Sequence, residues 1–224
     1  CDRALGITSA EEQPVLPKGN NLSLHLLELF TSQVAKVGMT DGIRQVLQEE
    51  SDALRAYYEQ AGILIARPAG GTSCRLAISA KGGTNAENHN HNDVGSYAVA
   101  LGSETMVGDQ GGPNSYPGHP VPVVDGRTQS SGGKAKGVVL QKEFTNEKDV
   151  FSIDYTSAYS TPNLDKLIRT FVYDRQGEGN FTVGDEFTAK TPIRFETAIT
   201  TRADWKILDD THLLLATDSE QMIV

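Results

Sequence analysis

The sequence Asn88-His89-Asn90-His91-Asn92-Asp93-Val94-Gly95-Ser96-Tyr97 packs two histidines, three asparagines and an aspartate into its first six residues. It then turns into an apolar run that ends at Leu101. Sixteen residues after His91 the chain reads Val107-Gly108-Asp109-Gln110-Gly111-Gly112. Polar side chains at this density, directly ahead of a strand, are expected where imidazoles and carboxylates converge on a metal ion or a substrate.

Downstream of Gly62 the hydrophobic period is two residues. Cys74, Leu76 and Ile78 alternate with polar or small neighbours, which is typical of a half-buried strand. We expect further strands near residues 63–66, 97–101, 104–107, 121–124, 137–143, 150–155, 166–173, 180–187, 193–200, 205–208 and 212–216. Many short strands with no helical pattern between them predict a mainly β protein, with an antiparallel β-sandwich over residues 61–224.

Residues 1–60 follow a different pattern. Residues 1–20 predict a loop, and leucines at helical spacing after Asn21 predict a helix that ends near Gly38. A second helix is predicted after Asp41, with Leu54 and Tyr57 on its inner face. We interpret 1–60 as a short helical segment, either the end of a helical domain or a linker.

The composition and net charge argue against several classes of protein. With 224 residues and 38% hydrophobic content, the chain can build either one large domain or a domain with a helical appendage. The net charge of −9 argues against nucleic acid as a partner, and it disfavours a polyanionic substrate unless positive charge is concentrated locally. Two cysteines define no disulfide framework. The sequence contains no apolar run of about eighteen residues, so it predicts no membrane span.

Positive charge is concentrated between residues 126 and 142. Arg127, Lys134, Lys136 and Lys142 occur there without any acidic residue, on and after a Ser-Ser-Gly-Gly loop. This pattern indicates either a solvated loop or a lip that meets an acidic polymer.

His91, Asp109 and His119 are the candidate metal ligands. Two histidines and a carboxylate suit zinc, which takes three or four nitrogen or oxygen ligands in such sites. The alternative is a hydrogen-bonded cluster of buried histidines that staples the sheet. Tyr116, between a Gly-Gly-Pro turn and His119, is a candidate to face a cleft.

Several of these segments together resemble the heparinase II/III-like domain of polysaccharide lyases that act on heparin, heparan sulfate and alginate. The resemblance covers about residues 60–220. The segments that carry it are Gly62-Ile63-Leu64-Ile65-Ala66-Arg67, the Asn88–Tyr97 block, Gly108-Asp109-Gln110-Gly111, His119 with Val123-Val124-Asp125-Gly126 and Gln129, and Phe181-Thr182-Val183-Gly184-Asp185-Glu186-Phe187.

The resemblance implies an N-terminal α/α toroid joined to a C-terminal antiparallel sandwich of the super-sandwich type. It implies that His91 binds a structural zinc ion with Asp109 and a later histidine, a role that His119 is placed to fill. It also implies that His89 faces the cleft and assists catalysis. The candidate substrate-binding residues are Asn88, Asn90, Tyr116 and Arg127.

The implied reaction is β-elimination on a uronate-containing glycan. The family's catalytic tyrosine and its neutralising Asn or His lie in the toroid, and only two predicted helices precede the sandwich in this chain. We therefore expect the chain to be the C-terminal part of a longer lyase that is periplasmic or secreted, with an acidic polysaccharide and the toroid as partners.

Two other classes remain open. The chain could be a non-catalytic carbohydrate-binding or structural sandwich with a metal site. It could also be a metal-dependent hydrolase that uses a zinc-bound water.

Overall fold

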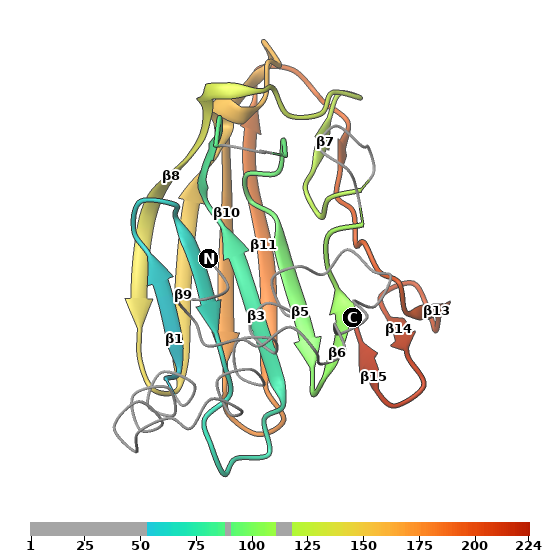
Figure 1. Ribbon diagram of the computed structural model, residues 1–224. Coiled ribbons are helices and arrows are strands. Elements are labelled where there is room, and N and C mark those ends of the chain that lie inside the picture. Colours follow the sequence, from blue (N-terminus) through green and yellow to red (C-terminus); the bar gives the residue numbers. More distant parts are fainter. Residues whose placement is uncertain (1–52, 88–90, 111–117) are drawn as a thin grey trace, which may run out of the picture. The chain divides into compact units, whose positions relative to one another are not determined.

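Two five-stranded antiparallel sheets dominate the computed structural model, which describes residues 53–87, 91–110 and 118–224 (Figure 1). The first sheet has the order β1-β2-β3-β5-β6. Its strands are β1 (Arg55–Tyr58), β2 (Ile63–Ala66), β3 (Leu76–Lys81), β5 (Tyr97–Leu101) and β6 (Glu104–Val107).

The second sheet has the order β11-β10-β9-β8-β4. Its strands are β4 (Gly83–Asn85), β8 (Gly132–Phe144), β9 (Lys148–Asp154), β10 (Leu164–Asp174) and β11 (Asn180–Ala189), and a 3-10 turn (Thr156–Ala158) follows β9. Two smaller sheets pair β7 (Val123–Val124) with β12 (Phe195–Glu196), and β14 (Leu213–Ala216) with β13 (Asp204–Ile207) and β15 (Gln221–Ile223).

Alternating side chains build the core between the two large sheets. In β10, Leu167, Phe171 and Tyr173 are buried and their neighbours are not, as the two-residue period of a strand requires. Phe171 stacks on Phe151 of β9 with ring centroids 6.0 Å apart. It also meets Tyr97 of the opposite sheet at 6.2 Å, so the aromatic cluster joins the two layers.

The chain crosses from one sheet to the other at Gly82-Gly83, between β3 and β4. Gly83 has φ of +68°, and a Cβ atom there would lie 2.4 Å from the carbonyl oxygen of Ala61. Only glycine fits this corner, which carries the chain from β3 towards the loop that bears His91.

The predicted sandwich is confirmed, and most predicted strands are present within a few residues of their expected bounds. The strand predicted at 193–200 is wrong over most of its length, because only Phe195–Glu196 pairs with β7. Residues 200 and 201 instead bond to the end of β6: Gly108 N–H donates to Thr200 O, and the Thr201 hydroxyl donates to Met106 O. The segment 195–201 thus pairs first with β7 and then bonds the end of β6.

The helix predicted to include Leu54 and Tyr57 is wrong at its end, because Arg55–Tyr58 is a strand paired with β2. Tyr57 packs on Phe144 and Phe151, and this tertiary packing overrides the helical spacing. The sandwich therefore includes residues upstream of 61, and the chain's two compact units divide between Ser51 and Asp52. The rest of the predicted helical segment lies outside the described residues.

Among the residues that the structure describes, none forms a helix with the length and hydropathy needed to span a bilayer.

Replacing Phe171 with alanine tests the core. Phe171 is 2% exposed, so truncation leaves a cavity between the sheets and should lower the free energy of unfolding by about 3–5 kcal/mol. Urea denaturation followed by fluorescence measures the change.

The matched control is Leu140→Ala on β8, where the side chain is 53% exposed. It should change the free energy of unfolding by only about 0.5 kcal/mol. Equal losses for the two variants would show that the aromatic cluster is not the core.

Candidate metal centre

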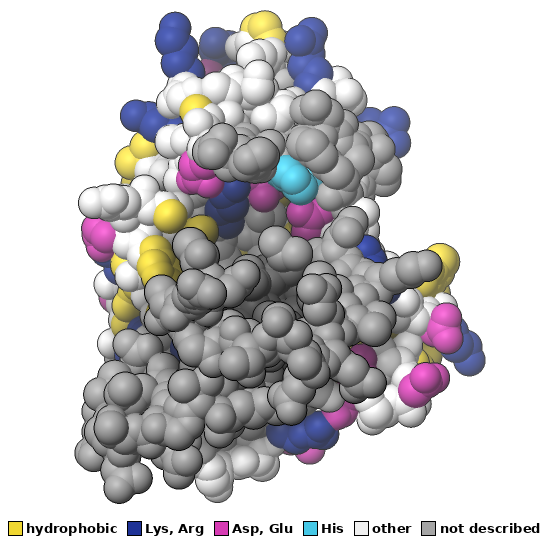
Figure 2. Space-filling model, viewed as in Figure 1, with side chains coloured by type: hydrophobic (Ala, Val, Ile, Leu, Met, Phe, Trp, Pro, Cys, Tyr) yellow, Lys and Arg dark blue, Asp and Glu magenta, His cyan; other side chains and the backbone are white. Residues whose placement is uncertain are grey.

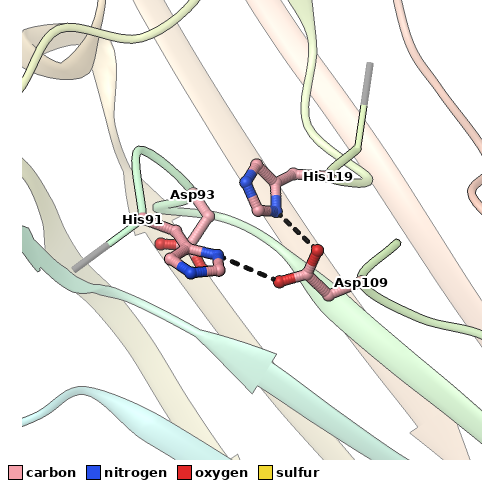
Figure 3. Close-up of side chains that lie close together, drawn as sticks. All are labelled: His91, Asp93, Asp109 and His119. Carbon is pink, nitrogen blue, oxygen red and sulfur yellow. Dashed lines mark hydrogen bonds and ion pairs between the residues drawn. The ribbon is translucent and has the colours of Figure 1, made fainter. Parts of the chain in front are cut away.

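Four potential metal ligands lie together where β5 begins (Figure 3). His91 and Asp93 precede β5, Asp109 follows β6, and His119 precedes β7. Each side chain offers one ligand atom, and these atoms all lie within 4.8 Å of one another. We call these four residues the metal group. Two connections contribute to it: the one between β4 and β5 carries His91 and Asp93, and the one between β6 and β7 carries Asp109 and His119.

Asp109 lies between the two imidazoles. Its Oδ2 is 3.2 Å from Nδ1 of His91, and its Oδ1 is 2.9 Å from Nδ1 of His119. The two imidazole centroids are 5.0 Å apart. In a tetrahedral zinc site with bonds of about 2.0–2.2 Å, ligand atoms lie about 3.4 Å apart, so small adjustments would accommodate a cation.

Asp93 has a different environment from Asp109. Asp93 is buried, and Lys81 Nζ lies 2.7 Å from its Oδ1. The side chain of Asp109 is 43% exposed and faces both histidines. Since the lysine already neutralises Asp93, Asp109 is the stronger candidate for the primary carboxylate ligand.

The donor set fits a divalent transition metal. Two imidazole nitrogens with carboxylate oxygens are the ligands that zinc takes when no cysteine is present. The same atoms could also hydrogen-bond as a histidine–carboxylate cluster, because each Nδ1 already points at an oxygen of Asp109. The group can therefore hold a cation, or it can staple the β4–β5 connection to the β6–β7 connection.

Two buried amide side chains hold the loop that carries His91 and Asp93. Asn85 Oδ1 accepts a hydrogen bond from the Asp93 N–H at 3.2 Å. Asn85 Nδ2 donates to Gln129 Oε1 at 2.9 Å, and Gln129 Nε2 donates to the carbonyl oxygen of Val94 at 2.6 Å. The loop backbone thus obtains side-chain partners in place of the backbone partners that a strand has.

Similar contacts hold the described ends of the β6–β7 connection, which carries Asp109 and His119. Gly108 N–H donates to Thr200 O at 3.0 Å, and the Thr200 hydroxyl donates back to Gly108 O at 2.7 Å, immediately before Asp109. Gln110 N–H donates to Gly118 O at 2.8 Å, which ties the Asp109 loop to the residue before His119.

A buried ion pair lies beneath the metal group. Arg169 of β10 is fully buried; its Nε and Nη2 donate to the two oxygens of Asp185 at 2.8 and 2.7 Å. Burial alone lowers the pKa of Arg169, but the hydrogen bond and charge of Asp185 outweigh it and raise that pKa above its usual range. Burial raises the pKa of Tyr155, whose neutral hydroxyl donates to Asp185 at 2.8 Å.

The structure brings His91, Asp109 and His119 together. Arg127 is exposed in the turn after β7, where its Nη1 lies 3.4 Å from the carbonyl oxygen of Ser160. The other predicted site residues lie outside the described residues: His89, Asn88, Asn90 and Tyr116.

Sequence reasoning missed Asp93 and Arg169. Asp93 belongs to the quoted polar block, but its spacing does not distinguish a ligand from a loop residue. The sequence does contain a signal for Arg169, because this residue occupies an inward position of the alternating pattern Leu167-Arg169-Phe171. A charged side chain at such a position requires a buried partner.

The predicted basic stretch divides in the structure. Lys142 lies near the end of β8, and its ammonium bonds Glu59 at 2.7 and 2.8 Å, which raises the pKa of that lysine. Lys134 and Lys136 lie at the beginning of β8. Lys142 therefore lies towards the opposite end of β8 from Lys134 and Lys136 and is paired with Glu59.

Solved structures with a similar fold include a heparan sulfate lyase and heparinase III. The heparan sulfate lyase HepC from Pedobacter heparinus matches with a TM-score of 0.63 and 14% identity over 89% of this chain and 33% of that chain. A HepC mutant matches with a TM-score of 0.61 and 15% identity, over 86% of this chain and 32% of that chain. A structure of heparinase III matches with a TM-score of 0.55 and 17% identity, over 75% of this chain and 28% of that chain.

The chain thus spans about a third of the length of these solved structures. At this identity the likeness establishes a heparinase-like fold. No family model and no curated protein matches the chain.

We predict that the purified chain binds zinc and that His91→Ala weakens this binding. Loss of an imidazole donor should lower affinity more than the roughly 10–100-fold typical of outer-sphere partners. Elemental analysis after dialysis and competition with a chromophoric chelator measure the effect.

His212→Ala is the matched control. His212 is exposed and its Nδ1 lies 2.9 Å from Asp209, so it is also a histidine beside a carboxylate, but outside the metal group. Zinc affinity should not change in this variant. Equal losses in both variants would refute the assignment of the metal group.

Proposed function

We propose that the chain is the C-terminal sandwich domain of a polysaccharide lyase that cleaves a uronate-containing glycan by β-elimination. In this proposal His91, Asp109 and His119 hold a structural zinc ion, with Asp93 as a further candidate. The observation that carries the proposal is the metal group itself, found on a fold shared with heparan sulfate lyases.

The proposed reaction needs a base and a way to stabilise negative charge. The base removes the proton α to the uronate carboxylate, the bond to the 4-linked oxygen breaks, and a carbon–carbon double bond forms as the leaving oxygen takes up a proton. Abstraction next to a carboxylate creates a dianionic species, which requires preorganised donors. No water is consumed.

His89 and His91 would have separate roles in this chemistry. An imidazole nitrogen that binds a metal cannot also act as a free base, whereas a neighbouring imidazole outside the metal group can contact the sugar. We propose that zinc, when bound, fixes the loop geometry, and that His89, Asn88, Asn90 and Tyr116 contact the glycan.

Positive charge near the metal group supports an acidic glycan as the partner. Figure 2 shows an exposed histidine beside acidic side chains, with lysine and arginine side chains along the rim above it. Arg127 is exposed in the turn after β7, and Lys134 and Lys136 are exposed at the beginning of β8. Within the described residues none of these three forms a salt bridge with a carboxylate, so their charges are available to sulfate or carboxylate groups.

The catalytic unit would include a second domain. The matching solved structures are about three times as long as the part that this chain covers. We propose that an N-terminal toroid of the complete, secreted or periplasmic protein supplies the catalytic tyrosine and the group that neutralises the uronate.

A non-catalytic carbohydrate-binding domain is the second candidate. The observation that favours it is a hollow of about 750 Å³ beside Gln110, lined by Trp205, Asp209 and Thr211 among others. Trp205 is 64% exposed, and a flat exposed indole next to polar side chains is a surface on which a sugar ring can bind.

Mutation of His89 in the complete gene product separates the two candidates. A lyase with His89→Ala should lose turnover, measured by the ultraviolet absorbance of the unsaturated uronate product, whereas a binding domain has no turnover to lose. His212→Ala should retain full turnover.

Two further outcomes would contradict the proposal. Strong formation of unsaturated product by the 224-residue chain alone would show that no second domain is needed. Products heavier by one water molecule per cleaved bond would indicate a hydrolase, because elimination adds no water.

A further inference from the structure

One nitrogen of Arg169 bonds two of the loops that form the metal group. Nη1 donates to the carbonyl oxygen of Gly95 at 2.8 Å and to the carbonyl oxygen of Pro120 at 2.9 Å. Gly95 lies two residues after Asp93, and Pro120 directly follows His119. The buried guanidinium of Arg169 therefore links the loop that carries His91 and Asp93 to the loop that carries His119.

Both bonded carbonyl groups belong to rigid turns. Gly95 N–H donates to Lys81 O at 2.8 Å, and Ser96 N–H donates to Asp93 O at 2.9 Å. Gly95 has φ of +85°, and a Cβ atom there would lie 3.2 Å from the ring of Tyr155. Beyond Pro120, Val121 N–H donates to His119 O at 2.8 Å. Movement of either carbonyl group would thus move a ligand of the metal group.

The orientation of the guanidinium is fixed from its other side. Asp185 accepts from both Nε and Nη2, a bidentate pairing that holds the plane of the group. Tyr155, packed near Gly95, donates its hydroxyl to the same carboxylate. Nη1 is consequently aimed at the two loops.

We propose that Arg169 is a positioning residue for the metal group, and that its guanidinium holds His119 at bonding distance from His91 and Asp109. The inference rests on the proposed metal site and goes beyond it, because it assigns the geometry of that site to a residue outside the metal group. Arg169 lies 50 positions after His119, the member of the metal group nearest to it in sequence. Lysine cannot replace it, since one ammonium cannot reach a bidentate carboxylate and two loop carbonyls at once.

Arg175 provides a matched control within the same region of the chain. It is also buried, at 4% exposure, and also pairs with a buried carboxylate, that of Asp149. The remaining hydrogen bonds of its side chain go to the carbonyl oxygens of Arg67 and Leu54, and none of these partners belongs to a loop that carries the metal group.

The experiment measures metal binding by the 224-residue chain and its Arg169→Lys and Arg175→Lys variants. Zinc affinity is measured by chelator competition, and ligand geometry by the visible absorption of the Co²⁺-substituted protein. Arg169→Lys should lower zinc affinity about 10–100-fold, as loss of an outer-sphere partner does, and alter the Co²⁺ bands. Arg175→Lys should lower the unfolding midpoint but leave affinity and bands unchanged.

Asp185→Asn is the second variant should Arg169→Lys not fold. It keeps one acceptor for the guanidinium, removes the charge that orients it, and should alter the Co²⁺ bands in the same direction. If a variant that folds keeps the zinc affinity and the Co²⁺ bands of the wild type, the inference is overturned and the zinc site stands. The same conclusion follows if Arg175→Lys weakens zinc binding as much as Arg169→Lys does. Failure of the wild-type chain to bind zinc or Co²⁺ would instead overturn the zinc proposal, and this inference with it.

Discussion

A guanidinium group inside the sandwich constrains everything around it. Arg169 is fully buried, so its charge must be matched within the protein. Removing an ion from water costs on the order of several kcal/mol even after the protein relaxes, and only close, well-oriented partners offset that cost. Asp185 supplies the opposite charge, and two loop carbonyls take the remaining nitrogen. Those loops cannot move away without leaving a buried donor unsatisfied.

Other buried polar side chains hold the same two connections. Asn85 and Gln129 are buried polar side chains that bond loop backbone groups near His91 and Asp93. Thr200 does so next to Asp109. Loop backbone lacks the ladder partners that strands have, and these side chains provide them. The sheets thus form a frame, and a few buried polar side chains connect it to the loops that carry the metal group.

This organisation also explains how a fold persists at 14–17% identity to heparan sulfate lyases. A sandwich is specified by alternation of buried and exposed positions, and many apolar sequences satisfy the same alternation. The site is less tolerant, because a metal group needs specific donor atoms at specific distances. Fold and site are therefore constrained to different degrees within one chain.

The sequence by itself determined the sandwich and the segments of the site. The two-residue period of Cys74, Leu76 and Ile78 reflects local backbone geometry, so it is readable without the fold. The polar density around His91 and Asp109 likewise marked both connections that carry the metal group.

Only the tertiary structure decided which residues meet. Arg55–Tyr58 became a strand because β2 pairs with it, and Asp93 acquired Lys81 as its partner. Arg169 acquired Gly95, 74 positions away in the chain. Such contacts depend on strand register and loop adjacency, which are properties of the assembled sheets and leave no periodic trace in the sequence.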